Sequence, residues 1–283
     1  MSPTRPRPGR GDRYDATRVQ LPNDLNAIFP YMMKGRNESI AYFPIQIDVE
    51  PLLAYIEATK GTDKAITLFQ AIMVALVKVL RARPTLNRYI KGRRLYQRRD
   101  VSLSFVARRQ YTDDSAETNV LVTVKPEDYR RTIIAKLKGE IRTAKSGAAK
   151  ADDQLISLFM RLPRGLLRLA IKLLDLYDFY VDTPGFLRGI DPMRASVFVA
   201  NLGSVGLDAP YHHLFEWGTC SLFVAIGQVQ PTVTVGADGA PTVRKMLTLR
   251  VSLDERIADG YYDARSLDLL REYLAHPEQL ENV

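Results

Sequence analysis

Hydrophobic and polar residues alternate along several short stretches of this chain, and longer apolar stretches with helical spacing lie between them. Residues 42–49 alternate in this way and contain Pro44, which predicts a strand at the edge of a sheet because proline cannot donate to a strand ladder. Thr67 can cap an apolar helix at 68–83, which we expect to end before Pro84. The same criteria predict further strands at 100–108, 119–124, 195–200, 221–228, 232–235 and 242–253, and further helices at 52–59, 126–143 and 260–276.

Strands and long helices are mixed throughout the chain, and no internal repeat is visible. This order predicts an α/β fold in which a large mixed sheet is covered by helices, in a single large domain at 21–283. Residues 1–20 are rich in Pro, Gly and Arg, and we expect them to form a disordered basic arm.

Within the domain we expect an apolar helical insertion at 154–190. Arg168, Lys172 and Asp175 form one narrow stripe on the central helix of this insertion, so most of the helix circumference is apolar. Such a helix must be covered. We expect it to pack over the domain or into an interface between subunits, and the alternatives are a lid over a pocket or a membrane-surface helix.

The charge balance is basic, with a net charge of +8 and a sequence pI near 9.5. Such a balance suits nucleic acid, a membrane surface or an anionic substrate. One cluster lies in the expected arm, and a second comprises Arg93, Arg94, Arg98 and Arg99. Neither cluster accompanies a nucleic-acid-binding motif, so we expect a solvated basic face and no nucleic-acid partner.

The single cysteine, Cys220, excludes an intramolecular disulfide and stands in an apolar stretch, which indicates an inert core thiol. No basic-then-apolar leader and no run of about 18 uncharged apolar residues is present. We therefore expect a cytoplasmic protein without a membrane span.

Five local strings occur in the order typical of one protein family. They lie at 45–49, 83–87, 101–106 and 199–206, and at the Asp-Gly start of the last helix. Together they resemble the catalytic domain of the acyltransferase component of 2-oxoacid dehydrogenase complexes, and its relative chloramphenicol acetyltransferase. The resemblance implies a CoA-dependent acyltransferase fold and a homotrimer, whose further assembly stays open. It also implies an active site between subunits, reached by CoA from one side and by a small acyl donor or acceptor from the other.

Two residues depart from the family pattern. The family motif His-x-x-x-Asp-Gly aligns with 255–260, so Glu255 stands where the catalytic His belongs. Ala200 stands where the family has a Ser or Thr that stabilises the oxyanion. Asp259 and Gly260 do match, and the resemblance gives Asp259 an architectural salt bridge, commonly to Arg.

Three residues are candidates for the missing base. His212 and His213 follow the 199–206 string in a loop that the resemblance places near the inter-subunit channel, and imidazole titrates near neutrality. Glu255 would serve only if burial raised its pKa, since a carboxylate is a much weaker base than a thiolate. With Asp259, these three form the candidate catalytic set.

Two functions from different classes therefore remain. In the first, the chain is an acyltransferase that acts on CoA thioesters through a non-standard inter-subunit site. In the second, it is a catalytically inactive pseudoenzyme that serves as a trimeric binding or scaffold protein. CoA or acyl-CoA is the expected substrate; the spacing of the three His and one Cys predicts no metal site, and Lys64, although in an Asp-Lys-Ala string, is expected to be an ordinary loop lysine and not a lipoyl-lysine.

Overall fold

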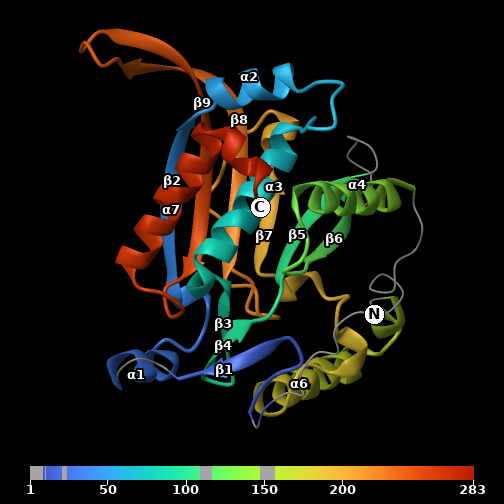
Figure 1. The fold of residues 1–283 in the computed structure, drawn as a ribbon. Helices are drawn as coiled ribbons and strands as arrows, with labels where there is room; N and C mark the ends of the chain where they lie inside the picture. Colours follow the sequence, from blue (N-terminus) through green and yellow to red (C-terminus); the bar gives the residue numbers. More distant parts are fainter. Residues whose placement is uncertain (1–8, 10, 21–23, 109–116, 147–156) are drawn as a thin grey trace.

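A mixed six-stranded sheet organises the chain (Figure 1). The computed structural model describes residues 9, 11–20, 24–108, 117–146 and 157–283. The strand order is β2-β9-β8-β7-β5-β6, in which β5, β7 and β8 run parallel and the other pairs are antiparallel. The strands are β2 (Ile40–Asp48), β5 (Val101–Arg108), β6 (Glu117–Val124), β7 (Val197–Asn201), β8 (Leu222–Val235) and β9 (Pro241–Asp254). The predicted mixed sheet is thus confirmed, and β2 with its Pro44 is an edge strand as expected.

One face of the sheet is covered by helices (Figure 1). They are α2 (Glu50–Ala58), α3 (Leu68–Ala82), α4 (Arg130–Ser146) and α7 (Gly260–Ala275). The predicted cap of α3 is confirmed, because Thr67 and Gln70 exchange hydrogen bonds between side chain and backbone in both directions. The main core lies between these helices and the sheet, and it buries alternate residues of β9 from Leu247 to Leu253.

The opposite face of the sheet is covered differently. Phe223 and Ala225 of β8 point away from the helices and pack with Phe198, Ala209 and Leu214 in a second, smaller cluster. Residues 202–220, which contain only one short 3-10 helix (Gly203–Val205), supply the covering side chains here. Among the described residues the covering by helices is therefore one-sided, and a loop lies over the other face.

A second sheet has three strands in the order β1-β4-β3 (Figure 1). They are β1 (Ala16–Val19), β3 (Arg88–Lys91) and β4 (Arg94–Arg98). The predicted disordered arm is therefore wrong at its end, because 16–19 pair with β4 and the Arg13 side chain is buried against Asp178 and Asp182. The rest of the arm, residues 1–8 and 10, lies outside the described residues.

The predicted solvated basic face is wrong at Arg98. This side chain is buried and donates hydrogen bonds to Asp15, Thr219 and the Ala195 carbonyl. A guanidinium can be buried when its N–H donors find acceptors. Here the acceptors are the carboxylate of Asp15, near the start of the chain, and groups of Ala195 and Thr219, far along it.

Helix α6 (Arg164–Tyr180) lies beside the small sheet, apart from the helices that cover the large one (Figure 1). A helix is present in the 154–190 segment as expected, but it does not pack over its own domain, because most of its leucines are exposed. The expected alternative, an interface between subunits, stays a prediction. The remaining elements are α1 (Asp24–Met32) and the short 3-10 helices Asn37–Ser39, Pro84–Asn87, Gly185–Leu187, Pro192–Arg194 and Pro277–Glu281. No helix in the described part of the chain combines the length and apolarity that crossing a bilayer requires.

A buried carboxyl group lies on the inner side of α7. Asp263 is only 1% exposed, and its Oδ1 has no hydrogen-bond partner among the described residues. Burial, followed by the negative charges of Asp259 and Glu255, raises the pKa of Asp263 to about 7. The carboxyl is therefore largely protonated in the folded chain at pH values where it ionises freely in the unfolded chain.

This difference predicts a pH-dependent effect of Asp263→Asn. Between about pH 4 and pH 7 the folded state holds a proton that the unfolded state has lost, so Asp263 makes the parent protein less stable as the pH rises through this window. The asparagine side chain of the variant does not ionise, so the variant does not lose stability in this way as the pH rises. We compare the free energy of unfolding of the variant with that of the parent at each pH. The difference should be more favourable to the variant at pH 8 than at pH 4, by up to about 4 kcal/mol at about 1.4 kcal/mol per pKa unit.

Urea unfolding at both pH values measures the effect. Asp268→Asn, on the exposed side of the same helix, is the matched control. An equal change in stability at the two pH values would contradict the raised pKa.

Candidate functional site

The exchanged motif lies in a tight turn between β9 and α7. Glu255 follows directly after β9; its backbone N–H donates to the Ser39 carbonyl at 2.9 Å, and its side chain is exposed. Asp254 and Arg256 on either side are buried and joined by two hydrogen bonds of 2.8 and 2.7 Å. Arg256 also donates to the Met33 carbonyl at 2.8 Å, so the turn is fixed to the segment after α1. The rigid parts of this turn are the neighbours of Glu255, and the Glu255 carboxylate itself faces solvent in the single chain.

Asp259 has a structural contact that differs from the expected one. Its carboxylate caps α7 by accepting a hydrogen bond of 2.8 Å from the Tyr262 backbone N–H. The resemblance gave this residue a salt bridge to Arg, but in the described part of the chain the nearby Arg256 pairs with Asp254 instead. Asp259 therefore positions the start of α7, and its negative charge raises the pKa of Asp263.

His212 and His213 lie in the loop over the other face of the sheet. The His212 ring stacks in parallel on Phe223 of β8, with centroids 3.9 Å apart, and His213 stacks on the outer side of His212 at 4.7 Å. Nδ1 of His212 lies 2.7 Å from the His213 carbonyl oxygen, and Nδ1 of His213 lies 3.0 Å from the Leu214 carbonyl oxygen. A carbonyl can only accept, so the neutral rings carry their proton on Nδ1 and have a lone pair on Nε2.

The protonation of His212 follows from its half-buried position. Burial lowers its pKa from the usual 6.5; the hydrogen bond to the His213 carbonyl opposes this shift, and the charge of His213 adds to it. The imidazole is therefore neutral at pH 7, and the lone pair on its Nε2 can accept a proton. The His213 ring is more exposed, and it stacks on the His212 ring with one face only.

Three contacts hold the histidine loop against the strands. Arg36 is buried and donates to carbonyl oxygens of Phe215, Glu216 and Gly218, which close the loop. Arg250 of β9 donates to the Ala209 carbonyl at 2.6 Å, and the Ser252 hydroxyl donates to the His212 carbonyl. Ser252 lies three residues before Glu255, so the structure brings the histidine loop and the exchanged motif to the same end of β9.

Ala200 lies on the same face of the sheet as the histidine loop. It pairs with Ala225 in the parallel β7–β8 ladder and packs against the cluster that contains Phe198 and Phe223. The resemblance expects a hydroxyl at this position. Its methyl group cannot donate a hydrogen bond to an oxyanion.

Sequence reasoning missed a second group beside the histidines. Tyr211 lies edge-on to Tyr42 of β2, with centroids 5.5 Å apart, and the Arg250 guanidinium lies 4.2 Å from its ring centroid. Both tyrosines are exposed. The only sequence signal was the position of Tyr211 next to the histidine pair, because Tyr42 and Arg250 reach this place through strand register.

Other candidate residues have structural contacts. Cys220 is buried, and burial raises the pKa of its thiol, which donates to the Leu222 carbonyl. Lys64 forms an ion pair of 2.7 Å with Glu281. Within the described ranges no group of three or more His, Cys, Asp or Glu side chains could hold a metal ion.

Known proteins share this fold. The family model described as 2-oxoacid dehydrogenases acyltransferase (catalytic domain) matches residues 188–281. A probable dihydrolipoamide acetyltransferase from Listeria monocytogenes is 16% identical over 95% of this chain and 96% of that chain, with a TM-score of 0.58. The cubic core of the pyruvate dehydrogenase multienzyme complex is 15% identical over 93% of this chain and 94% of that chain, with a TM-score of 0.61. A chloramphenicol acetyltransferase is 9% identical over 92% and 99%, with a TM-score of 0.51.

These matches confirm the resemblance and the fold. The family match covers the part of the chain that contains Ala200, the histidine loop and the motif with Glu255. The structural likeness extends over nearly the whole chain, and at these identities it establishes the fold alone. No curated protein sequence matches the chain significantly.

The lowered pKa of His212 predicts its titration. We expect the His212 ring to titrate below pH 6.5, because burial against Phe223 disfavours the imidazolium. The unfolded chain then binds more protons as the pH falls through 6.5, so His212 makes the fold less stable on the acid side. NMR of the imidazole protons measures the midpoint, with His212→Gln to assign the signal. A midpoint at or above 6.5 would contradict this prediction.

Proposed function

We propose that this chain is a CoA-dependent acyltransferase that moves an acyl group between thiols, with His212 as its general base. The carrying observation is the His212 imidazole, which has its proton on Nδ1 and is held between Phe223 and His213, in a loop that Ser252 of β9 binds three residues before Glu255. The family match over 188–281 supports the reaction class. The matched structures include a probable dihydrolipoamide acetyltransferase, so a dithiol is the first acceptor to test.

The reaction needs one proton acceptor that later returns its proton. His212 Nε2 takes the proton from the attacking thiol, and the resulting sulfur attacks the thioester carbonyl of acyl-CoA. When the tetrahedral intermediate collapses, the carbon–sulfur bond to CoA breaks, and the imidazolium gives its proton to the CoA thiolate. The acyl group is transferred, the second thiol is released, and the imidazole returns to its starting state.

His212 suits this role better than the other two candidates. Its ring is stacked on both faces, whereas the His213 ring is exposed and the Glu255 carboxylate faces solvent. A general base must also be unprotonated at the working pH, and the lowered pKa of His212 meets this condition for the imidazole. Arg250, beside Tyr211, supplies a positive charge close by for the phosphates of CoA.

The proposed site lies between the subunits of a cytoplasmic homotrimer. In the single chain the outer side of His213 and the rings of Tyr42 and Tyr211 are exposed, so the site is open on one side. A neighbouring subunit would close this side and exclude water from the thioester, which protects the thioester from hydrolysis and strengthens electrostatic interactions.

The pseudoenzyme is the second candidate function, and one observation favours it. With Ala200 in place of Ser or Thr, the oxyanion lacks a donor at that position, and loss of one such donor typically costs about 100-fold to 1000-fold in rate. A chain that has also exchanged the motif His for Glu255 could keep the fold and the binding site for CoA without the reaction.

The proposed base predicts the behaviour of two single variants. His212→Ala should lower kcat/KM for acetyl transfer from acetyl-CoA to dihydrolipoamide by about 100-fold or more, because the proton acceptor is removed. His213→Ala should have a smaller effect, since it removes only one stacking partner. Release of CoA measures the rate, and His276→Ala at the far end of α7 is the matched control. Activity that survives both loop variants but disappears in Glu255→Gln would assign the base to Glu255.

The pseudoenzyme candidate makes a different prediction. If the parent protein does not turn over, Glu255→His combined with Ala200→Ser should produce CoA-dependent acyl transfer, because both family groups are restored on an unchanged fold. CoA should raise the melting temperature of the parent and of the double variant alike. A stabilised parent with no turnover, together with a gain in the double variant, would identify a pseudoenzyme. A parent that turns over would exclude it.

A further inference from the structure

Helix α6 is attached to the protein through its charged side. Asp178 is its only fully buried residue, and its carboxylate lies against Arg194, Arg13 and Lys91. Asp175, one turn earlier, forms an ion pair of 2.8 Å with Lys91. The backbone is close as well, because a Cβ at Gly92 would lie 2.3 Å from the Phe179 carbonyl oxygen. The orientation of α6 is therefore fixed by buried ion pairs and a close backbone contact.

The opposite side of α6 presents an apolar stripe to solvent. Leu166, Leu169, Leu173, Leu176 and Tyr180 follow each other at intervals of three and four residues, so they lie on one face, and each is more than half exposed. Residues 157–160 are also helical, and Leu158 and Met160 in this turn are exposed too. An apolar surface of this length on a chain otherwise packed in the usual way marks a surface that meets a partner.

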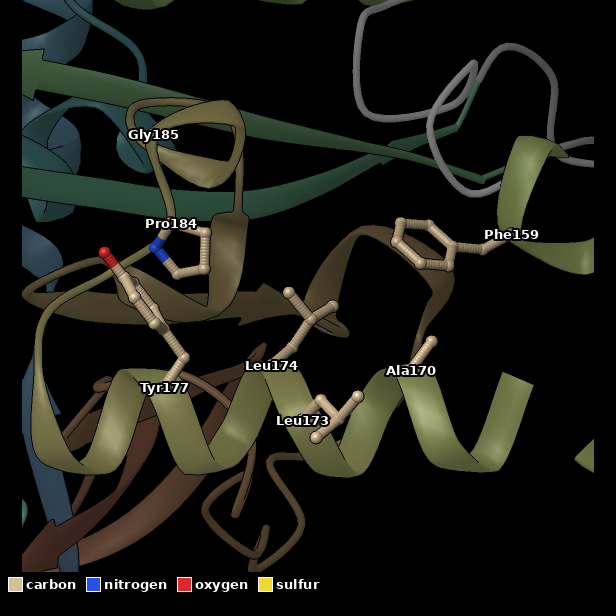
Figure 2. Close-up of a pocket in the computed structure, with 7 residues that line it drawn as sticks. All are labelled: Phe159, Ala170, Leu173, Leu174, Tyr177, Pro184 and Gly185. Carbon is tan, nitrogen blue, oxygen red and sulfur yellow. The ribbon is translucent and has the colours of Figure 1, made fainter. Parts of the chain in front are cut away.

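An apolar groove runs along one edge of this stripe. Figure 2 shows Leu174 and Tyr177 pointing from α6 toward Pro184, with Phe159 closing the far end. The groove has a volume of about 470 Å³ and is lined by Phe159, Ala170, Leu173, Leu174, Tyr177, Pro184 and Gly185. None of these side chains carries a charge, so the groove suits a hydrocarbon chain.

The other edge of the stripe is basic. Going around the helix from Leu176, Lys172 comes first and Arg168 second; both are exposed, and among the described residues neither is in an ion pair. The only exposed acidic residue of α6, Asp175, is already paired with Lys91. Within the described residues, this edge of the stripe therefore has positive charge that no carboxylate pairs with.

We propose that α6, together with residues 157–162, lies flat on the surface of a bilayer that contains anionic lipids. The leucine stripe enters the boundary between headgroups and acyl chains, the basic row contacts lipid phosphates, and the groove receives one acyl chain. The charges favour this occupant over a second copy joined through the same stripe. Such a two-fold contact would bring two basic edges together, whereas anionic headgroups neutralise them.

The proposal excludes a spanning helix. The 17 residues of α6 would extend over about 26 Å, less than the roughly 30 Å of a bilayer core, and the helix has charged residues along one side. An in-plane helix that combines leucines with basic residues binds reversibly, and its binding weakens with salt because the basic contribution is screened.

Sedimentation of the full chain with lipid vesicles tests the proposal. We expect the parent protein to bind vesicles of phosphatidylcholine with about 30% phosphatidylglycerol and to bind pure phosphatidylcholine far more weakly. Arg168→Gln with Lys172→Gln should weaken binding to the anionic vesicles by about 25-fold, at about fivefold for each charge. Leu169→Ser with Leu173→Ser should weaken it by at least about tenfold.

Matched controls change the same residue types elsewhere on the surface. Arg131→Gln with Lys138→Gln removes two exposed positive charges of α4. Val233→Ser with Val235→Ser changes two exposed apolar residues of β8. Both control proteins should bind as the parent does. All eight substituted residues are exposed, and melting temperatures verify that each variant is folded.

Three results would overturn the proposal. The first is a parent that does not bind the anionic vesicles. The second is binding that the two α6 variants do not reduce relative to their controls. The third is a parent that ignores vesicles while Leu169→Ser with Leu173→Ser lowers its mass in light scattering, which would assign the stripe to a second copy of the chain.

Discussion

The alternation of side chains along β9 determines both the main core and the candidate site. β9 lies between β2 and β8, so both of its edges are hydrogen bonded. Leu249, Val251 and Leu253 point to the helices and are buried, whereas Arg250 and Ser252 point the other way and hold the histidine loop. A shift of one residue in the register would exchange these two sets. The core therefore fixes the position of the histidine loop, because a register shift of β9 that moved Arg250 and Ser252 off this loop would also expose the leucines of the core.

Much of the fold was predictable, because it follows from local patterns. The alternation at 42–49, the cap at Thr67 and the Asp-Gly start of α7 each depend on residues within a few positions of each other. The buried arginines were not predictable in this way. Arg98 reaches Asp15 across 83 positions and Thr219 across 121, and only the folded chain brings those acceptors together.

In the candidate site too, the features that depend on local sequence were predictable and those that depend on long-range contacts were not. The family strings indicated the positions of Glu255 and Ala200, but they gave no information on the proton of His212, which depends on the 2.7 Å contact of Nδ1 with a carbonyl. In α6, the sequence identified an amphipathic helix but not its orientation. Asp178 decides the orientation, because a carboxylate surrounded by three basic side chains stays buried while the leucines face outward.

The contact between Arg13 and Asp178 joins residues that are 165 positions apart. A ribosome makes the chain from its N-terminus, so Arg13 emerges long before Asp178 exists. Until then β1 lacks the carboxylate that neutralises the buried Arg13, and the outer edge of β4 has no stable partner. The buried ion pair that fixes the start of β1 can therefore form only after α6 has been made, so the small sheet is completed by a long-range contact and not by its local hairpin alone.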